Sequence, residues 1–178
     1  GDAAARLAQT SVAWVAAIES GKLILPPAED GARRRVLIRR GYADPALLGL
    51  HRSALIAGGF EVVDCPQQPG RKRNAADLNI TIDTLDALHH PAGYDEFILL
   101  SADADFTPVL LRLRAHNRTT AIYGDEAVSA AYRAIADGTV DAARFAAVLA
   151  GETLDPKPEP IVAESPSDGA GDGSGFSA

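Results

Sequence analysis

Short apolar runs alternate with amphipathic stretches along most of this chain. The apolar runs predict buried strands, and the stretches with apolar residues three and four positions apart predict helices. Strands are expected at 35–39, 60–64, 94–100 and 119–123, with a short edge strand at 139–140. Helices are expected at 3–18, 45–57, 74–89, 108–116, 126–135 and 142–149. This alternation predicts an α/β fold with a mostly parallel central sheet that helices cover on both faces.

The alternation stops near residue 150. From Gly151 the chain is rich in Pro, Glu, Ser, Gly and Asp, a composition that buries too little apolar surface to become ordered. We therefore expect a folded domain at 1–150 and a disordered acidic tail at 151–178. Six acidic residues and one lysine lie in this tail, so most of the net charge of −7 belongs to it.

Composition restricts the class of protein further. A chain of 178 residues with 47% hydrophobic residues is long enough to bury a core. No apolar run approaches the length of a membrane span, so a membrane partner is not expected. The single cysteine, Cys65, cannot form an internal disulfide, which favours a reducing compartment and hence a cytoplasmic location. Its position at a strand end predicts a buried, structural thiol.

Two carboxylates follow the strand predicted at 94–100. Asp103 and Asp105 stand between this strand and Thr107-Pro108, a typical helix start, with Ser101 beside them. Ligands of open α/β sheets bind beyond the carboxyl ends of the strands, and two acids there favour a hard cation with oxygen ligands. Alternatively, the acids cap the helix and complement its dipole, which accounts for one acid more readily than for two.

A third acid, Asp77, lies in the first turn of the helix predicted at 74–89. Asp83, six residues on, points about 120° away from it, and the apolar residues of this helix are expected on its buried side. These apolar residues are Leu78, Ile82, Leu85 and Leu88. The residues that immediately precede Asp77 suit phosphate binding, and they are Arg71, Lys72, Arg73 and Asn74. Carboxylates that hold Mg²⁺ or Mn²⁺ beside phosphate binders indicate metal-assisted hydrolysis of a phosphodiester.

These motifs resemble those of a known family. Arg73-Asn-Ala-Ala-Asp77, then Asp83, then Ser101-Ala-Asp-Ala-Asp-Phe-Thr-Pro108 are similar to the NYN domain, in the LabA-like branch of the PIN-like nucleases. The resemblance runs from about residue 33 to residue 145 and includes Ala136-Asp137 near its end.

The resemblance implies a Rossmann-like, three-layer α/β/α domain with a metal-dependent ribonuclease site. Asp77, Asp103 and Asp105 match the family's acidic positions, which are both catalytic and metal-binding, and Ser101 matches the adjacent polar position. Arg73 stands where the family usually has lysine. Arg71, Lys72, Asn74 and Ser101 are expected with Arg73 at the substrate. RNA is the expected partner, although no feature here excludes DNA, and a homodimer is compatible with the sequence.

The chain departs from the family at its amino end. The family begins with an apolar strand that ends in an aspartate, and no such strand precedes the one predicted at 35–39. We therefore expect an N-terminally incomplete domain whose first strand lies upstream of Gly1. Without that strand the sheet would lose a central member and the site its first acid.

Two other functions compete with the nuclease. Asp103-Ala-Asp-Phe-Thr107 imitates the nucleophile motif of haloacid-dehalogenase-like phosphatases, but these need a later lysine, and none occurs between Lys72 and Lys157. The second alternative is a non-catalytic RNA- or protein-binding module on the same fold, because a fold does not determine its function.

Neutralising the basic loop tests its contact with RNA. Replacing Arg71, Lys72 and Arg73 by Ala should weaken RNA binding and flatten its dependence on salt, because fewer counterions are released. Deleting the tail should leave the melting temperature unchanged, since the tail buries little surface. The measurement is a salt titration of RNA affinity for the intact, loop-neutralised and tail-deleted proteins. An unchanged salt slope in the loop variant would mean that RNA follows another path.

Overall fold

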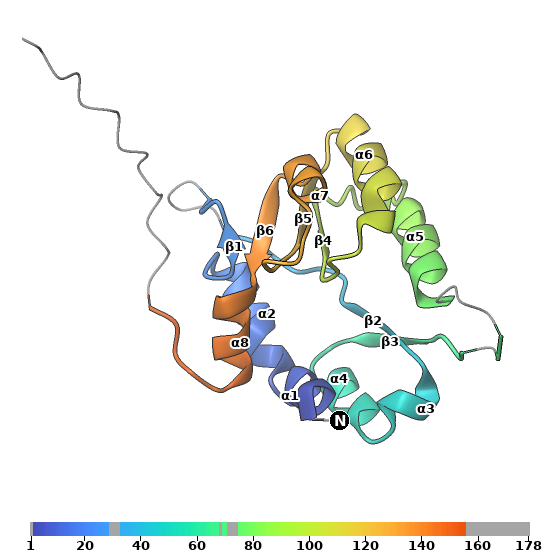
Figure 1. Cartoon of the computed structure of the whole chain (residues 1–178), viewed down its shortest axis with the longest axis vertical. Coiled ribbons are helices and arrows are strands. Elements are labelled where there is room, and N and C mark those ends of the chain that lie inside the picture. Colours follow the sequence, from blue (N-terminus) through green and yellow to red (C-terminus); the bar gives the residue numbers. More distant parts are fainter. Residues whose placement is uncertain (1, 29–32, 68, 71–74, 156–178) are drawn as a thin grey trace, which may run out of the picture.

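The computed structural model describes residues 2–28, 33–67, 69–70 and 75–155. It has a mixed α/β structure with mostly parallel strands, as the sequence predicts (Figure 1). The helices are α1 (Asp2–Gln9), α2 (Ser11–Glu19), α3 (Pro45–Leu48), α4 (His51–Ala57), α5 (Ala75–Leu88), α6 (Thr107–Ala115), α7 (Ala130–Ile135) and α8 (Ala142–Leu149). A 3₁₀ turn, η1 (Ala104–Phe106), leads directly into α6. Arg71, Lys72, Arg73, Asn74 and the tail from 156 to 178 lie outside the described residues.

The strands form two separate sheets. The larger sheet has the order β1–β6–β5–β4, with parallel pairing except between β1 and β6. Its strands are β1 (Ile24–Leu25), β4 (Glu96–Leu99), β5 (Thr119–Gly124) and β6 (Gly138–Asp141). The smaller sheet pairs β2 (Arg40–Ala43) with β3 (Glu61–Asp64) in parallel. Within the described residues, β2 and β4 each have one edge that pairs with no strand.

Helix α5 packs against the smaller sheet. Asn79, early in α5, contacts Cys65 beyond the end of β3, and Asp83, one turn later, contacts Tyr42 of β2. Helix α5 therefore runs antiparallel to β2. The charges of Asp103 and Asp105, in the loop that follows β4, also act on Asp77 in the first turn of α5. The first turn of α5 therefore lies near residues that follow β3 and residues that follow β4.

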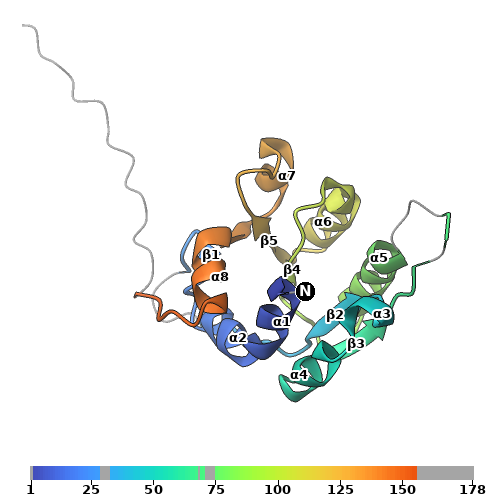
Figure 2. The same ribbon diagram turned by 60° about the horizontal axis from the view of Figure 1, so that its bottom comes forward.

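Helices pack on both sides of the larger sheet. Figure 2 shows α2 and α8 together on one side of β4 and β5, and α6 and α7 on the other. The α2–α8 core comprises Trp14, Val15, Ala17, Ile18, Leu23, Ile24, Ala121, Val140, Phe145 and Val148. The α6–α7 core comprises Leu88, Leu99, Phe106, Val109, Leu110, Leu113, Ile122, Val128 and Tyr132. The larger sheet therefore buries apolar side chains on two faces, which is typical of parallel sheets.

Trp14 joins the two sheets on the α2 side. Its ring lies 5.3 Å from that of Phe60, which precedes β3, and 5.6 Å from that of Phe145 on α8. Its indole Nε1 donates a hydrogen bond of 3.0 Å to the Leu7 carbonyl oxygen of α1. Because the strands of the two sheets share no backbone hydrogen bonds, aromatic packing of this kind helps to hold them together.

The predicted strand at 35–39 is wrong, because the strand formed by this region is β2, at Arg40–Ala43. The residues before it are held by side chains instead. The Nε atom of Arg34 donates a hydrogen bond of 2.7 Å to Glu96 at the start of β4, and the backbone N–H of Arg34 donates to the Glu19 carbonyl. The short strand β1, at Ile24–Leu25, is not among the strands expected from the sequence.

Two predicted helices are each divided into two. The helix expected at 3–18 is interrupted at Thr10, where φ is −99° and ψ is 12°, and both the hydroxyl and the backbone N–H of Thr10 donate to the Arg6 carbonyl. The helix expected at 45–57 is interrupted at Gly49, where φ is +49°. The other helices lie where they are expected, and α8 has the predicted bounds.

The buried side of α5 is not the one predicted. Leu78 and Ile82 are 63% and 47% exposed, whereas only Leu88 of the predicted stripe is buried. The helix instead turns Ala76, Asn79 and Asp83 toward the rest of the protein, and hydrogen bonds satisfy the last two. A polar inner face of this kind leaves no apolar pattern in the sequence.

Because α2 closely approaches the end of α4, adding one methyl group at Gly58 is expected to lower the stability of the fold. A Cβ atom on Gly58 would lie 2.1 Å from the Ser11 hydroxyl, whereas a Cβ atom on Gly41 would meet nothing closer than 3.9 Å. Gly58→Ala should therefore destabilise the fold by about 1–3 kcal/mol through overpacking, and Gly41→Ala is the matched control. Thermal unfolding of both variants checks this, and equal melting temperatures would contradict the described packing.

Candidate functional site

The loop between β4 and α6 presents two carboxylates at the carboxyl end of the strand. Oδ1 of Asp103 accepts a hydrogen bond of 2.9 Å from the backbone N–H of Asp105, and Oγ of Ser101 accepts one of 3.2 Å from the N–H of Asp103. Phe106 anchors the loop in the α6–α7 core, and Pro108 occupies the first turn of α6. The capping prediction is thus confirmed for Asp103, while both acidic side chains remain exposed.

Asp77 comes to this loop from α5. The pKa of its half-buried carboxyl is raised, first by burial and then by the negative charges of Asp103 and Asp105. Asp77 is therefore close enough to the other two acids for their negative charges to oppose its ionisation. No ion pair between their side chains and a described cationic side chain offsets this repulsion.

The three carboxylates do not form a complete metal-binding site among the described residues. No three His, Cys, Asp or Glu side chains of the described residues are arranged so that they could hold a metal ion. The donor set of carboxylates and a hydroxyl suits Mg²⁺ or Mn²⁺, since these cations prefer oxygen ligands and retain several waters. Asp77, Asp103 and Asp105 are the residues that would hold such a cation. Their expected role as shared ligands stays a prediction.

Asp83 has a structural role. Its Oδ2 atom accepts a hydrogen bond of 2.8 Å from the Tyr42 hydroxyl and lies 3.8 Å from a guanidinium nitrogen of Arg40. Burial and the Asp83 carboxylate raise the pKa of Tyr42 above its ordinary value, so the phenol remains a donor. These contacts attach α5 to β2 and thereby position the helix turn that carries Asp77.

Two residues near the loop were missed by sequence reasoning. Asp125 directly follows β5, the strand beside β4, and Oδ1 of its side chain accepts a 2.9 Å hydrogen bond from the N–H of Ala127. An acid two residues after the strand predicted at 119–123 was the available signal. The second is Tyr132 of α7, whose pKa is raised to about 12 by burial and then by Asp103. A tyrosine on an apolar helix face gives no functional signal.

Asp137, the other acid within the family-like motifs, lies away from these carboxylates. Its Oδ2 atom accepts a 2.8 Å hydrogen bond from the N–H of Thr120, near the start of β5, and the N–H of Asp137 donates in return to the Thr120 carbonyl. It therefore fixes the amino end of the sheet, opposite the end that carries Asp103.

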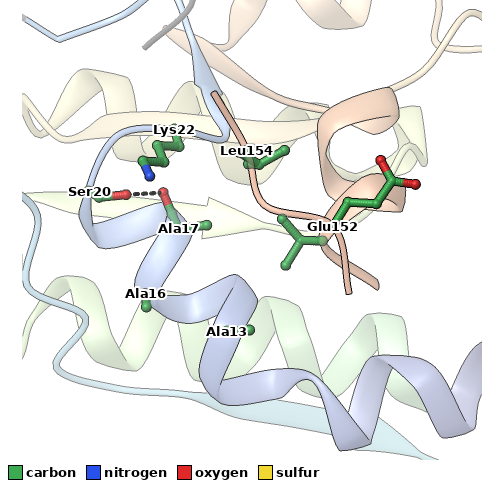
Figure 3. Close-up of a pocket in the computed structure, with 8 residues that line it drawn as sticks. Ala13, Ala16, Ala17, Ser20, Lys22, Glu152 and Leu154 are labelled. Atoms are coloured by element: carbon green, nitrogen blue, oxygen red, sulfur yellow. Dashed lines mark hydrogen bonds between the residues drawn. The ribbon is translucent and has the colours of Figure 1, made fainter. Parts of the chain in front are cut away.

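A hollow in the surface lies away from the acidic site. A pocket of about 350 Å³ between α2 and the segment that follows α8 is floored by Ala13, Ala16 and Ala17, with Lys22 and Glu152 at its rim (Figure 3). The Ser20 hydroxyl in its wall already donates to the Ala17 carbonyl. None of the predicted site residues lines this pocket, so it adds nothing to the acidic site.

Within the described part of the chain, no helix has the length and apolar character that crossing a membrane requires.

Comparisons with known proteins identify the fold. No curated protein matches the chain. A solved structure of a protein of unknown function from Vibrio parahaemolyticus is similar over 75% of this chain and 79% of its own, with a TM-score of 0.53 and 23% sequence identity, which is evidence for the fold alone. The family model for the NYN domain matches residues 13–145, a range that contains Asp77, Asp103 and Asp105. The LabA-like branch and the three-layer arrangement stay predictions. The chain belongs to the NYN domain family.

Proposed function

We propose that this chain is a metal-dependent ribonuclease that hydrolyses RNA phosphodiester bonds with Asp77, Asp103 and Asp105. Membership of the NYN family supports a nuclease-type fold. The observation that carries the proposal is that the charges of Asp103 and Asp105, in the loop after β4, act on Asp77 of α5 and raise its pKa, and that no described cationic side chain pairs with these acids. Ionised carboxylates gathered in this way favour a divalent cation that relieves their repulsion.

The proposed cofactor is Mg²⁺ or Mn²⁺, held by these three acids. When bound, such a cation activates water and stabilises negative charge on phosphate oxygens. Asp103 is already oriented by its own cap to the N–H of Asp105, and Asp77 is oriented by the attachment of α5 to β2. Preorganised charges of this kind are what phosphoryl chemistry requires.

Substrate binding is assigned to the basic loop. Arg71, Lys72, Arg73 and Asn74 immediately precede α5, so they stand next to Asp77 in the sequence. Arginine and lysine neutralise backbone phosphates without regard to sequence. Ser101, whose hydroxyl accepts from the N–H of Asp103, is proposed to contribute at the same end of β4.

One further strand would complete this arrangement. Strands β2 and β4 each have an edge that pairs with no described strand. A parallel strand between them would join the two sheets and end beside Asp103. We include the single central sheet and an additional acid on that strand in the proposal.

The runner-up is a non-catalytic RNA- or protein-binding module. It is favoured by one observation, namely that no three potential ligands among the described residues could hold a metal ion as they stand. RNA that is bound but not cut in the presence of Mn²⁺, by protein free of contaminating nuclease, would select this alternative.

Asp103→Asn tests the catalytic assignment. Asparagine caps a helix about as well as aspartate, so the variant should fold normally while losing its ligand charge. Cleavage of RNA in Mg²⁺ or Mn²⁺ should fall by several orders of magnitude, because metal-based water activation and charge stabilisation are each worth several kcal/mol. The assay compares rates with and without EDTA.

The matched control is Asp86→Asn, which removes an exposed acid from the outer side of α5. Its cleavage rate should equal that of the parent. Undiminished cleavage by the Asp103 variant would contradict the assignment.

A second prediction follows from the repulsion at Asp77. Because the folded state raises the pKa of Asp77, ionisation of this group costs stability, which is lost as the pH rises through its folded pKa. At pH 7 without cation, Asp77→Asn should therefore melt at or above the temperature of the parent. Added Mn²⁺ should raise the melting temperature of the parent more than that of the variant.

Asp86→Asn again serves as the control and should respond to Mn²⁺ as the parent does. A variant of Asp77 with the full response to Mn²⁺ would show that this carboxylate is not a ligand.

A further inference from the structure

Tyr132 has a buried hydroxyl group that makes no hydrogen bond. The side chain is 2% exposed, and its Oη atom has no partner among the described residues. Buried polar groups are nearly always satisfied, so an orphaned one calls for a physical reason. A phenyl ring would fill the same space without the cost of removing a hydroxyl from water.

Tyr132 belongs to the same apolar core as the residues that flank the acidic loop. It shares the α6–α7 core with Leu99, the last residue of β4, and with Phe106, which directly follows Asp105. The first turn of α7 is fixed because Oγ of Ser129 accepts a 3.2 Å hydrogen bond from the N–H of Tyr132. The tyrosine is therefore held in place beside the loop that carries Asp103.

The charges and donors of the two side chains are complementary. The Asp103 carboxylate acts on the Tyr132 hydroxyl and, after burial, raises its pKa, so the hydroxyl keeps its proton at neutral pH. One oxygen of Asp103, Oδ1, accepts from the N–H of Asp105, and its Oδ2 atom accepts from no described group. The Tyr132 hydroxyl, which has no acceptor, is thus close enough to the Asp103 carboxylate for the two groups to interact electrostatically. The Oδ2 atom of that carboxylate has no described donor.

We propose that Tyr132 is a positioning residue of the aspartate site, whose hydroxyl holds the Asp103 carboxylate by a hydrogen bond when the site is loaded with its cation. This inference rests on the proposed function. Carboxylates that bind metals are commonly oriented by hydrogen bonds from residues behind them, and loss of such a partner lowers metal affinity by about 10–100-fold. The bond would keep Asp103 in one orientation while it binds the cation.

Tyr132→Phe tests the proposal because it removes the hydroxyl alone. Without cation, the melting temperature should be unchanged or higher, since the hydroxyl has no partner to lose. The dissociation constant for Mn²⁺, measured by calorimetric titration of the full chain, should rise about tenfold or more. Tyr123→Phe is the matched control: this half-buried tyrosine of β5 packs on Phe145 in the α2–α8 core and should leave Mn²⁺ affinity unchanged.

The outcomes separate this inference from the proposed function. A parent that binds Mn²⁺ and a Tyr132→Phe variant that binds it equally well would overturn the role of Tyr132 alone. A lower melting temperature of the cation-free variant would also overturn it, since the hydroxyl would then have a structural partner. A parent that binds no Mn²⁺ would overturn the proposed metal site and this inference together.

Discussion

The acidic site depends on how α5 is held between two sheets that share no backbone hydrogen bonds. Its inner face is polar: Asp83 accepts from the Tyr42 hydroxyl of β2, and Asn79 donates to the Cys65 sulfur beyond β3. These contacts fix the helix in the direction that brings Asp77 to the loop after β4. Hydrogen bonds are directional, so they set the orientation of the helix more narrowly than apolar packing alone. A structural contact on one sheet thereby determines where a candidate ligand lies beside the other.

Much of the fold could be predicted because apolar runs mark strands that are buried on both faces. This pattern predicted the strand before the acidic loop and the strand at 119–123. The helical spacing of apolar residues predicted helix α8. The prediction was wrong where polar contacts, and not the burial of apolar residues, determine the structure. Strand β2 is half-buried and begins with Arg40, so hydropathy marked the more apolar residues before it. In α5 the polar residues face inward and Leu78 faces outward, which reverses the rule that assigns apolar residues to the core.

The candidate site was partly visible in the sequence for a related reason. Acids that follow a strand and precede a helix are exposed by the chain's local geometry, so Asp103 and Asp105 could be found from their position alone. The position of Asp77 in the first turn of a helix, after a run of basic residues, made it a candidate, but its approach to the loop depends on the tertiary arrangement. Tyr132 could not be found, because a buried tyrosine in an apolar helix face looks like any other core residue. Its proposed role follows from a buried hydroxyl group without a hydrogen-bond partner, which a sequence does not show.

The central claim is that the three carboxylates together bind one divalent cation. Anomalous diffraction from crystals of the full chain grown with Mn²⁺ tests this most directly. We expect a single strong peak enclosed by Asp77, Asp103 and Asp105, at the carboxyl end of β4. A peak at another acid such as Asp125, or no peak at saturating Mn²⁺, would contradict it.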